Sequence, residues 1–221
     1  KFPQYHLFRA DYIAGLFTID ADEALIQEQL DLIDVTHQLA LVHLINMCHY
    51  YDQDDKADMM LKRASEATVL DANFYTLIGQ GAIKYERPEM ASIYFAESLK
   101  RVDDDDDRLH IQVQHASSYL EFDMEKEGET ILKDILKRHP DFGPAHLSYA
   151  ILYMGRSNTQ RTKFYLSKAE KWAKANKHPE MLRIIEDFRF QIDNPLASML
   201  PPGFDPSMLP PGMDIEDVIN L

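Results

Sequence analysis

The chain has 221 residues, and 45% of them are hydrophobic, which is enough for one elongated domain with a continuous core. Its formal net charge of −14 argues against nucleic acid and anionic membrane as partners, because both bind basic surfaces. The single cysteine, Cys48, permits no disulfide within the chain and fits a reducing compartment, so we expect a cytoplasmic protein. No apolar run is long enough to span a membrane. Because the chain starts at Lys1 rather than Met, we expect it to have been trimmed, and a removed signal peptide is the alternative.

The first 37 residues are predicted to form a helical hairpin, with helices over about residues 5–17 and 21–35. Asp20 or Asp22 is suited to cap the second helix. That helix carries apolar residues at helical spacing, namely Leu25, Ile26, Leu30 and Ile33. The hairpin is either a degenerate fifth repeat or a dimerisation arm.

Four small residues then recur at intervals of 34, 37 and 34 residues: Ala57, Ala91, Gly128 and Thr162. A period near 34 is typical of helix–turn–helix repeats that stack into a solenoid. Other columns at fixed offsets are also small or apolar, such as Cys48, Ala82, Tyr119 and Tyr153. We therefore predict four repeats over residues 38–71, 72–108, 109–142 and 143–178.

The longer middle interval contains an acidic run, Asp103 to Asp107. We interpret it as an exposed turn between repeats that carries the three extra residues. A calcium loop is the less favoured interpretation, because such a loop needs alternating oxygen ligands, a central glycine and a closing glutamate.

Residues 179–193 are predicted to form a capping helix that covers the last open face of the solenoid. From residue 194 to 221 we predict an extended Pro-rich tail, in which SMLPPGFDP is followed at once by SMLPPGMDI. The tail is either disordered or a docking strand whose apolar side chains enter a groove. The docking side chains would be Met199, Leu200, Phe204, Met208, Leu209 and Met213.

The sequence contains few residues in patterns typical of catalytic or metal-binding sites. His37, His43 and His49 are spaced by six residues, so they diverge around a helix. No HExxH, CxxC or glycine-rich phosphate loop is present. We therefore expect no enzyme activity, no cofactor and no metal.

The small and apolar columns are typical of the tetratricopeptide repeat (TPR) family, which the chain resembles over about residues 38–174. The resemblance implies an all-α, right-handed superhelix of four to five helical hairpins. In that family, five positions on the first helix of each repeat (the second, fifth, ninth, twelfth and thirteenth) line a concave groove. The corresponding residues here are Leu39, Val42, Asn46, His49, Tyr50, Asn73, Thr76, Gln80, Ile83, Lys84, His110, Val113, Ser117, Leu120, Glu121, Pro144, Leu147, Ile151, Met154 and Gly155.

A groove that mixes aliphatic, amide and hydroxyl side chains suits an extended peptide. The basic positions that grip a carboxylate in the chaperone-binding TPR clamps correspond to Val42, His110 and Gln114 here, so we do not expect such a clamp. Because the chain is acidic, the expected partner is an apolar or basic polypeptide segment.

Residues 67–84 and 115–132 also resemble the class II chaperones of type III secretion. That resemblance implies a cytoplasmic protein that holds a client segment in its groove and often dimerises through N-terminal helices. We predict a non-catalytic interaction module, either a secretion-type chaperone or an assembly adaptor. The alternative is a scaffold or homo-oligomer whose tail docks into its own or a neighbouring groove.

Overall fold

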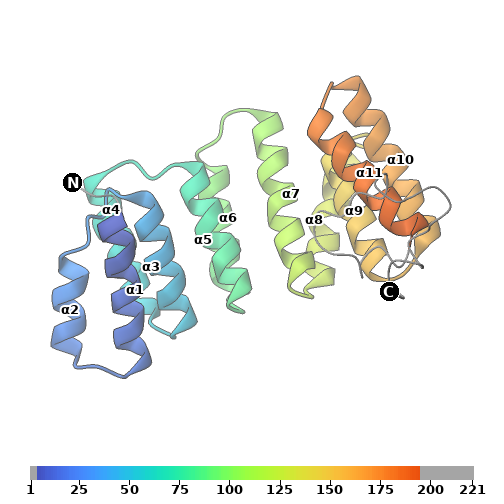
Figure 1. The fold of residues 1–221 in the computed structure, drawn as a ribbon. Coiled ribbons are helices and arrows are strands. Elements are labelled where there is room, and N and C mark those ends of the chain that lie inside the picture. Colours follow the sequence, from blue (N-terminus) through green and yellow to red (C-terminus); the bar gives the residue numbers. More distant parts are fainter. Residues whose placement is uncertain (1–3, 195–221) are drawn as a thin grey trace, which may run out of the picture. The chain divides into compact units, whose positions relative to one another are not determined.

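The computed structural model describes residues 4–194 of the chain, so the predicted docking residues of the tail lie outside the described part. Residues 4–194 form eleven helices and no strand, which confirms the all-α prediction (Figure 1). The helices are α1 (Gln4–Thr18), α2 (Glu23–Asp31), α3 (Gln38–Tyr50), α4 (Asp54–Ala67), α5 (Ala72–Lys84), α6 (Pro88–Leu99), α7 (Asp105–Glu121), α8 (Glu125–Arg138), α9 (Gly143–Gly155), α10 (Thr159–Ala175) and α11 (Pro179–Asp193).

The chain divides into two compact units, residues 1–131 (unit 1) and 132–221 (unit 2). In unit 1, α1, α3, α5 and α7 pack in succession, while α2, α4 and α6 pair with α1, α3 and α5 (Figure 1). In unit 2, α9 packs against α10 and α10 against α11. The boundary falls within α8, inside the predicted third repeat.

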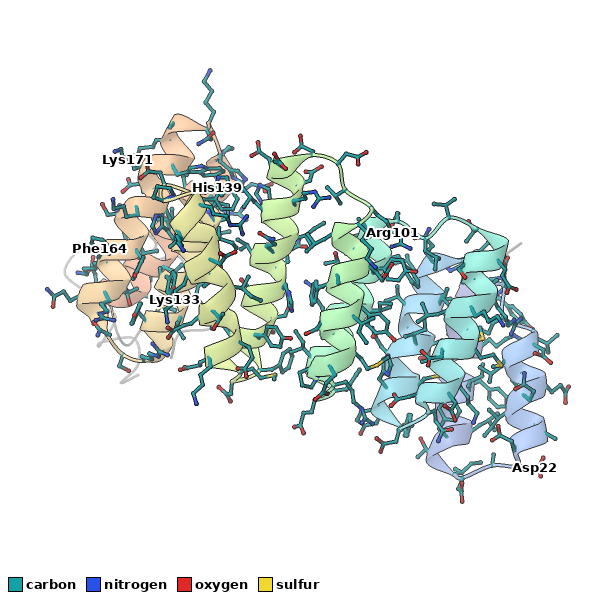
Figure 2. All side chains as sticks on the ribbon, turned by 180° about the vertical axis from the view of Figure 1, so that it is seen from behind. Asp22, Arg101, Lys133, His139, Phe164 and Lys171 are labelled. Carbon is teal, nitrogen blue, oxygen red and sulfur yellow. The ribbon has the colours of Figure 1, made fainter. Side chains whose placement is uncertain are left out.

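Three first helices begin where the repeats were predicted to begin: α3 at Gln38, α5 at Ala72 and α9 at Gly143. A side chain accepts a backbone hydrogen bond at the start of several helices, which satisfies an otherwise unpaired N–H. Asp71 accepts from the Phe74 N–H at 2.7 Å. Asp22, labelled in Figure 2, caps α2 by accepting from the Ala24 N–H at 2.9 Å.

The acidic run differs from the exposed turn that we expected. Asp104 is the N-cap of α7 and accepts from the N–H groups of Asp106 and Asp107 at 2.9 and 3.1 Å. Residues 105–107 form the first turn of the helix, which has 17 residues where α3, α5 and α9 have 13. Carboxylates are favourable at a helix N-terminus because they oppose its partial positive charge. The extra residues therefore lengthen a helix instead of a loop.

A left-handed residue ends the first helix of each hairpin. These residues are Asp20, Asp52, Glu86, Asp123 and Ser157, with φ of 50°, 56°, 59°, 60° and 52°. In each case the following N–H donates to a carbonyl five residues earlier in the chain, as Arg87 does to Ala82 at 2.8 Å. This is the Schellman arrangement of helix ends. The last four turn residues are separated by the same 34, 37 and 34 positions as the small residues, so the repeat exists in the backbone as well as in the sequence.

The predicted small residues are buried where helices approach each other. Ala57, Ala91 and Thr162 are at most 1% exposed, and Gly128 is also buried. A Cβ at Gly128 would lie only 2.8 Å from the Ala116 carbonyl oxygen and 2.7 Å from a Leu120 methyl group. Glycine at this position therefore allows α8 to pack closely on α7.

His115 packs α7 against α6. Its ring stacks on Phe95 at 4.0 Å and 17°, and its Nε2 is buried without a hydrogen-bond partner. Burial lowers the pKa of His115 to about 4, because an imidazolium loses its hydration there.

In unit 2, the single tryptophan lies between α9 and α10. The Trp172 ring meets Phe142 edge-on at 5.7 Å and covers Gly143, where an added Cβ would lie 2.6 Å from the indole. The neighbouring core connects α9, α10 and α11 and comprises Ala150, Leu166, Ala169, Ala173, Met181 and Ile185. In the described part of the chain, no helix is long and apolar enough to cross a membrane.

We predict that Ser157→Gly stabilises the protein by about 0.5–1 kcal/mol, because glycine adopts positive φ without steric cost. Urea denaturation measures the change in the free energy of unfolding. Ser157→Ala is the matched control and should not stabilise, since it keeps the Cβ. A stabilisation by alanine equal to that by glycine would contradict the explanation.

We also predict that stability falls as the pH drops from 7 to 5. His115 has a lower pKa in the folded protein than in the unfolded chain, so the unfolded chain binds the extra proton between pH 6.5 and 4. His115→Phe keeps the stacked ring without the titration and should reduce the loss between pH 7 and 5 by about 2 kcal/mol. Parallel urea titrations at the two pH values give the comparison, and equal losses in both proteins would show that His115 is not the cause.

Candidate functional site

A pocket of about 480 Å³ lies in unit 1, where the α5–α6 turn and the α7–α8 turn meet. We call it the turn pocket. Its lining combines an apolar floor with charged residues and consists of Ile83, Lys84, Glu86, Pro88, Glu121, Phe122, Asp123 and Met124.

The repeated turn places these side chains. Lys84 and Glu121 are the last residues of α5 and α7. Two residues further on come Glu86 and Asp123, which have the left-handed conformation. Pro88 is the first residue of α6, where its missing N–H leaves no helical hydrogen bond unmade. The pocket therefore follows from two consecutive copies of one turn.

The charge of the turn pocket is negative. Glu86, Glu121 and Asp123 contribute three exposed carboxylates, against the single ammonium of Lys84. Beneath them Ile83 is 1% exposed, while Phe122 is 37% exposed and offers its ring to solvent. Such a pocket is suited to a side chain with an apolar stem and a positive end.

A row of aromatic rings runs along the hairpin turns of unit 1. Phe17, Tyr51, Tyr50 and Tyr85 form this aromatic row, with successive ring centroids 5.7, 4.7 and 5.2 Å apart. Tyr50 is 57% exposed. The row ends at the turn pocket, because Lys84 lies on the Tyr85 ring with its Nζ 5.6 Å from the centroid.

The structure separates the predicted groove residues into two groups. Positions two, nine and thirteen, counted from the predicted repeat starts at residues 38, 72 and 109, are exposed or partly exposed in unit 1: Leu39, Asn46, Tyr50, Asn73, Gln80, Lys84, His110, Ser117 and Glu121. Positions five and twelve turn inward: Val42, His49, Thr76, Ile83, Val113 and Leu120 are buried or partly buried. Three predicted residues, Ile83, Lys84 and Glu121, come together in the turn pocket.

The inward group requires a correction to the predicted surface. His49 is 1% exposed and its ring nitrogens bond to Asp54 at 2.8 Å and to the Tyr94 hydroxyl at 2.9 Å. Thr76 is 4% exposed and its hydroxyl bonds to Ser98 at 2.8 Å. Val113, at 8% exposure, is also buried. These side chains pack the helices together, so they do not belong to a partner-binding surface.

The same division holds in unit 2. Leu147, at position five of α9, packs against the core of that unit, whereas Ile151, at position nine, is 45% exposed. Met154, at position twelve, is partly buried.

Asn46 lies between α3 and α5, against the Cα atom of Gly81. A Cβ at Gly81 would overlap the amide of Asn46, so glycine is required for this approach. The Oδ1 of Asn46 is buried and has no hydrogen-bond partner.

Within residues 4–194, no group of three His, Cys, Asp or Glu side chains is placed to hold a metal ion. Cys48 is fully buried, and this burial raises the pKa of its thiol to about 12, which makes it an unreactive core residue.

Five residues of the turn pocket were not predicted from the sequence: Glu86, Pro88, Phe122, Asp123 and Met124. All but Pro88, the first residue of α6, lie in the turns that follow α5 and α7, whereas the predicted groove positions lie within the first helices. One signal was available, because the aromatic residues directly after α3, α5 and α7 (Tyr51, Tyr85 and Phe122) recur at the same 34 and 37 intervals.

No protein-family model matches the chain, and no curated protein matches it. Among solved structures, the chain is similar to PilW, described as a widely conserved type IV pilus biogenesis factor. The identity is 17% and the TM-score 0.39, over 88% of this chain and 96% of PilW. At this level the similarity supports no conclusion about function.

We predict that Gly81→Ala destabilises the protein by about 1–3 kcal/mol, because the new methyl group displaces Asn46 and separates α3 from α5. The control is Gly155→Ala at the end of α9, where an added Cβ meets no atom within 4 Å. Thermal unfolding of both variants gives the comparison. If Gly81→Ala is as stable as the control, the close approach is not needed.

Proposed function

We propose that the protein is a non-catalytic module that binds an extended segment of a partner polypeptide on unit 1. The observation that carries the proposal is the turn pocket, an acidic pocket with an apolar floor at one end of an aromatic row. The bound segment would run across α3, α5 and α7 and place one side chain in the pocket.

The chemistry of the pocket favours lysine or arginine in that place. The aliphatic stem of such a side chain would lie on Phe122 and Met124, and its charged end would reach Glu86, Glu121 and Asp123. Because the carboxylates are exposed, their attraction decreases with salt. They contribute more to the choice of partner than to affinity.

The ninth positions of the first helices supply contacts for the backbone of the segment. Asn46, Gln80 and Ser117 are partly exposed amide and hydroxyl side chains in successive repeats. Groups of this kind bind the main chain of an extended peptide, while neighbouring pockets select its side chains. Covering an apolar segment in this way is the action of a chaperone or an assembly adaptor.

The charge of the pocket favours such a partner over the chain's own tail. Residues 195–221 contain four acidic residues, Asp205, Asp214, Glu216 and Asp217, and no lysine or arginine. Three more carboxylates at the pocket would repel this segment. The tail-docking alternative is therefore the less favoured of the two.

We predict that Glu121→Lys selectively weakens binding of basic peptides. Peptides of twelve residues would be selected on the protein from a library of random sequence, and their affinities measured by fluorescence anisotropy. We expect the selected peptides to carry a lysine or arginine among aliphatic residues. The variant should raise the dissociation constant about tenfold, equivalent to about 1.4 kcal/mol. Glu28→Lys, at an exposed position of α2, is the matched control and should leave the affinity unchanged.

The proposal is wrong if the selected peptides lack basic residues or bind the variant as well as the original protein. A peptide of residues 195–221 serves as a competitor in the same assay. If it displaces the selected peptides at comparable concentration, the tail-docking alternative is the better account.

A further inference from the structure

Three consecutive turns of unit 1 share one backbone position but differ in the side chain that it carries. The residue after the left-handed residue is Gln53 in the α3–α4 turn, Arg87 in the α5–α6 turn and Met124 in the α7–α8 turn. In each turn its N–H donates to a carbonyl five residues back, at 2.7, 2.8 and 2.9 Å, and its side chain is partly buried. The three residues are therefore equivalent, and we call their place the closing position.

The arginine at the closing position of the α5–α6 turn reaches back to the preceding turn. Arg87 forms an ion pair with Asp52, which is the left-handed residue of the α3–α4 turn. The acidic left-handed residue of one turn is thus paired with the closing residue of the next turn.

The following pair of turns has the acid but not the arginine. Glu86 is the left-handed residue equivalent to Asp52, and the closing residue of the next turn is Met124. Within the described part of the chain, no basic side chain forms an ion pair with Glu86, and the ammonium of Lys84 lies on the Tyr85 ring. Glu86 and Met124 both line the turn pocket. The pocket therefore lies where the pattern of the preceding turns would place a guanidinium group.

The backbone at Glu86 is a second, independent observation. Its φ is 59°, and three of the other four residues that end first helices in this conformation are aspartates: Asp20, Asp52 and Asp123. Aspartate tolerates the left-handed region because its short side chain can bond to the local backbone, an advantage that glutamate lacks. The glutamate carboxylate instead extends one methylene further from the backbone. Such locally unfavourable conformations are concentrated at binding sites.

We propose that the turn pocket binds arginine in preference to lysine, and that the partner's guanidinium group pairs with Glu86 as Arg87 pairs with Asp52. This inference rests on the proposed function, since it concerns the same pocket, and it adds the identity of the side chain that enters. The partner thereby supplies the arginine that the chain itself supplies one repeat earlier.

The chemistry of the pocket also favours a guanidinium group over an ammonium group. Glu86 and Asp123 come from adjacent turns, and the planar fork of arginine can bond to two carboxylates at once. Phe122 is 37% exposed, and guanidinium groups stack on aromatic faces. A guanidinium is also more weakly hydrated than an ammonium, so it loses less on reaching the apolar floor formed by Ile83 and Met124.

The first test uses the full 221-residue chain with N-acetyl-arginine amide and N-acetyl-lysine amide as probes. Methyl NMR of the methionines follows binding, because Met124 lines the pocket, whereas Met60 is fully buried in α4 and is the internal control. The arginine probe should shift the Met124 signal with a dissociation constant in the millimolar range, about threefold or more below that of the lysine probe. The Met60 signal should not move.

Glu86→Gln tests the carboxylate, because it removes the charge and keeps the shape of the side chain. It should raise the dissociation constant of the arginine probe by about threefold and reduce the difference between the two probes. Glu28→Gln, at an exposed position of α2, is the matched control and should change neither.

Met124→Arg tests the equivalence of the turns without any ligand. The new arginine occupies the closing position and should pair with Glu86, as Arg87 does with Asp52. Glu86→Gln should therefore raise the unfolding equilibrium constant by about twofold more in Met124→Arg than in the original protein. Urea denaturation of the four proteins gives the comparison, and Glu28→Gln should have the same effect in both backgrounds.

Equal binding of the two probes, or no shift of the Met124 signal with either, would overturn the proposal. Additive effects of Met124→Arg and Glu86→Gln on unfolding would also overturn it. If the arginine probe binds at Met124 but no extended peptide is selected, the proposed function fails and the preference for arginine stands. If the selected peptides bind equally well with lysine in place of arginine, the preference fails and the proposed function stands.

Discussion

The left-handed turn that closes each first helix is the constraint on which the structure depends. One residue with φ between 50° and 60° reverses the chain, and the next N–H fixes the reversal by bonding to a carbonyl five residues back. The turn sets the angle at which the second helix returns. This return brings small residues such as Ala91 and Gly128 into the helix contact, where a larger side chain would not fit. The regular spacing of small residues is thus a consequence of the regular turn.

The proposed binding surface arises from the same element. Two adjacent turns supply most of the turn pocket, and the aromatic residues that end α3 and α5 supply the row that leads to it. A helix interior alternates buried and exposed positions, whereas a turn exposes consecutive side chains. A hairpin repeat therefore presents its densest set of recognition groups at the turns, and their variation from repeat to repeat gives each pocket its own chemistry.

Much of the fold could be predicted from the sequence, because α3, α5 and α9 begin at the predicted residues Gln38, Ala72 and Gly143. The start of α7 could not, since an aspartate run is typical of loops and also stabilises a helix N-terminus. The site was only partly predictable. Family positions do not tell whether His49 or Thr76 faces a partner or a neighbouring helix, because a few degrees of helix rotation decide this. The turn residues around Phe122 carry no helical periodicity, so a search for helical faces passes over them.

The position of Trp172 has a practical consequence. It is the only tryptophan of the chain, and it lies between α9 and α10, on Gly143 and beside Phe142. Its fluorescence therefore follows the packing of unit 2 alone, whereas circular dichroism follows the helices of both units. Recording the two signals during one denaturation shows whether the units melt together or in sequence. The molecule thus contains a natural optical probe of its own cooperativity.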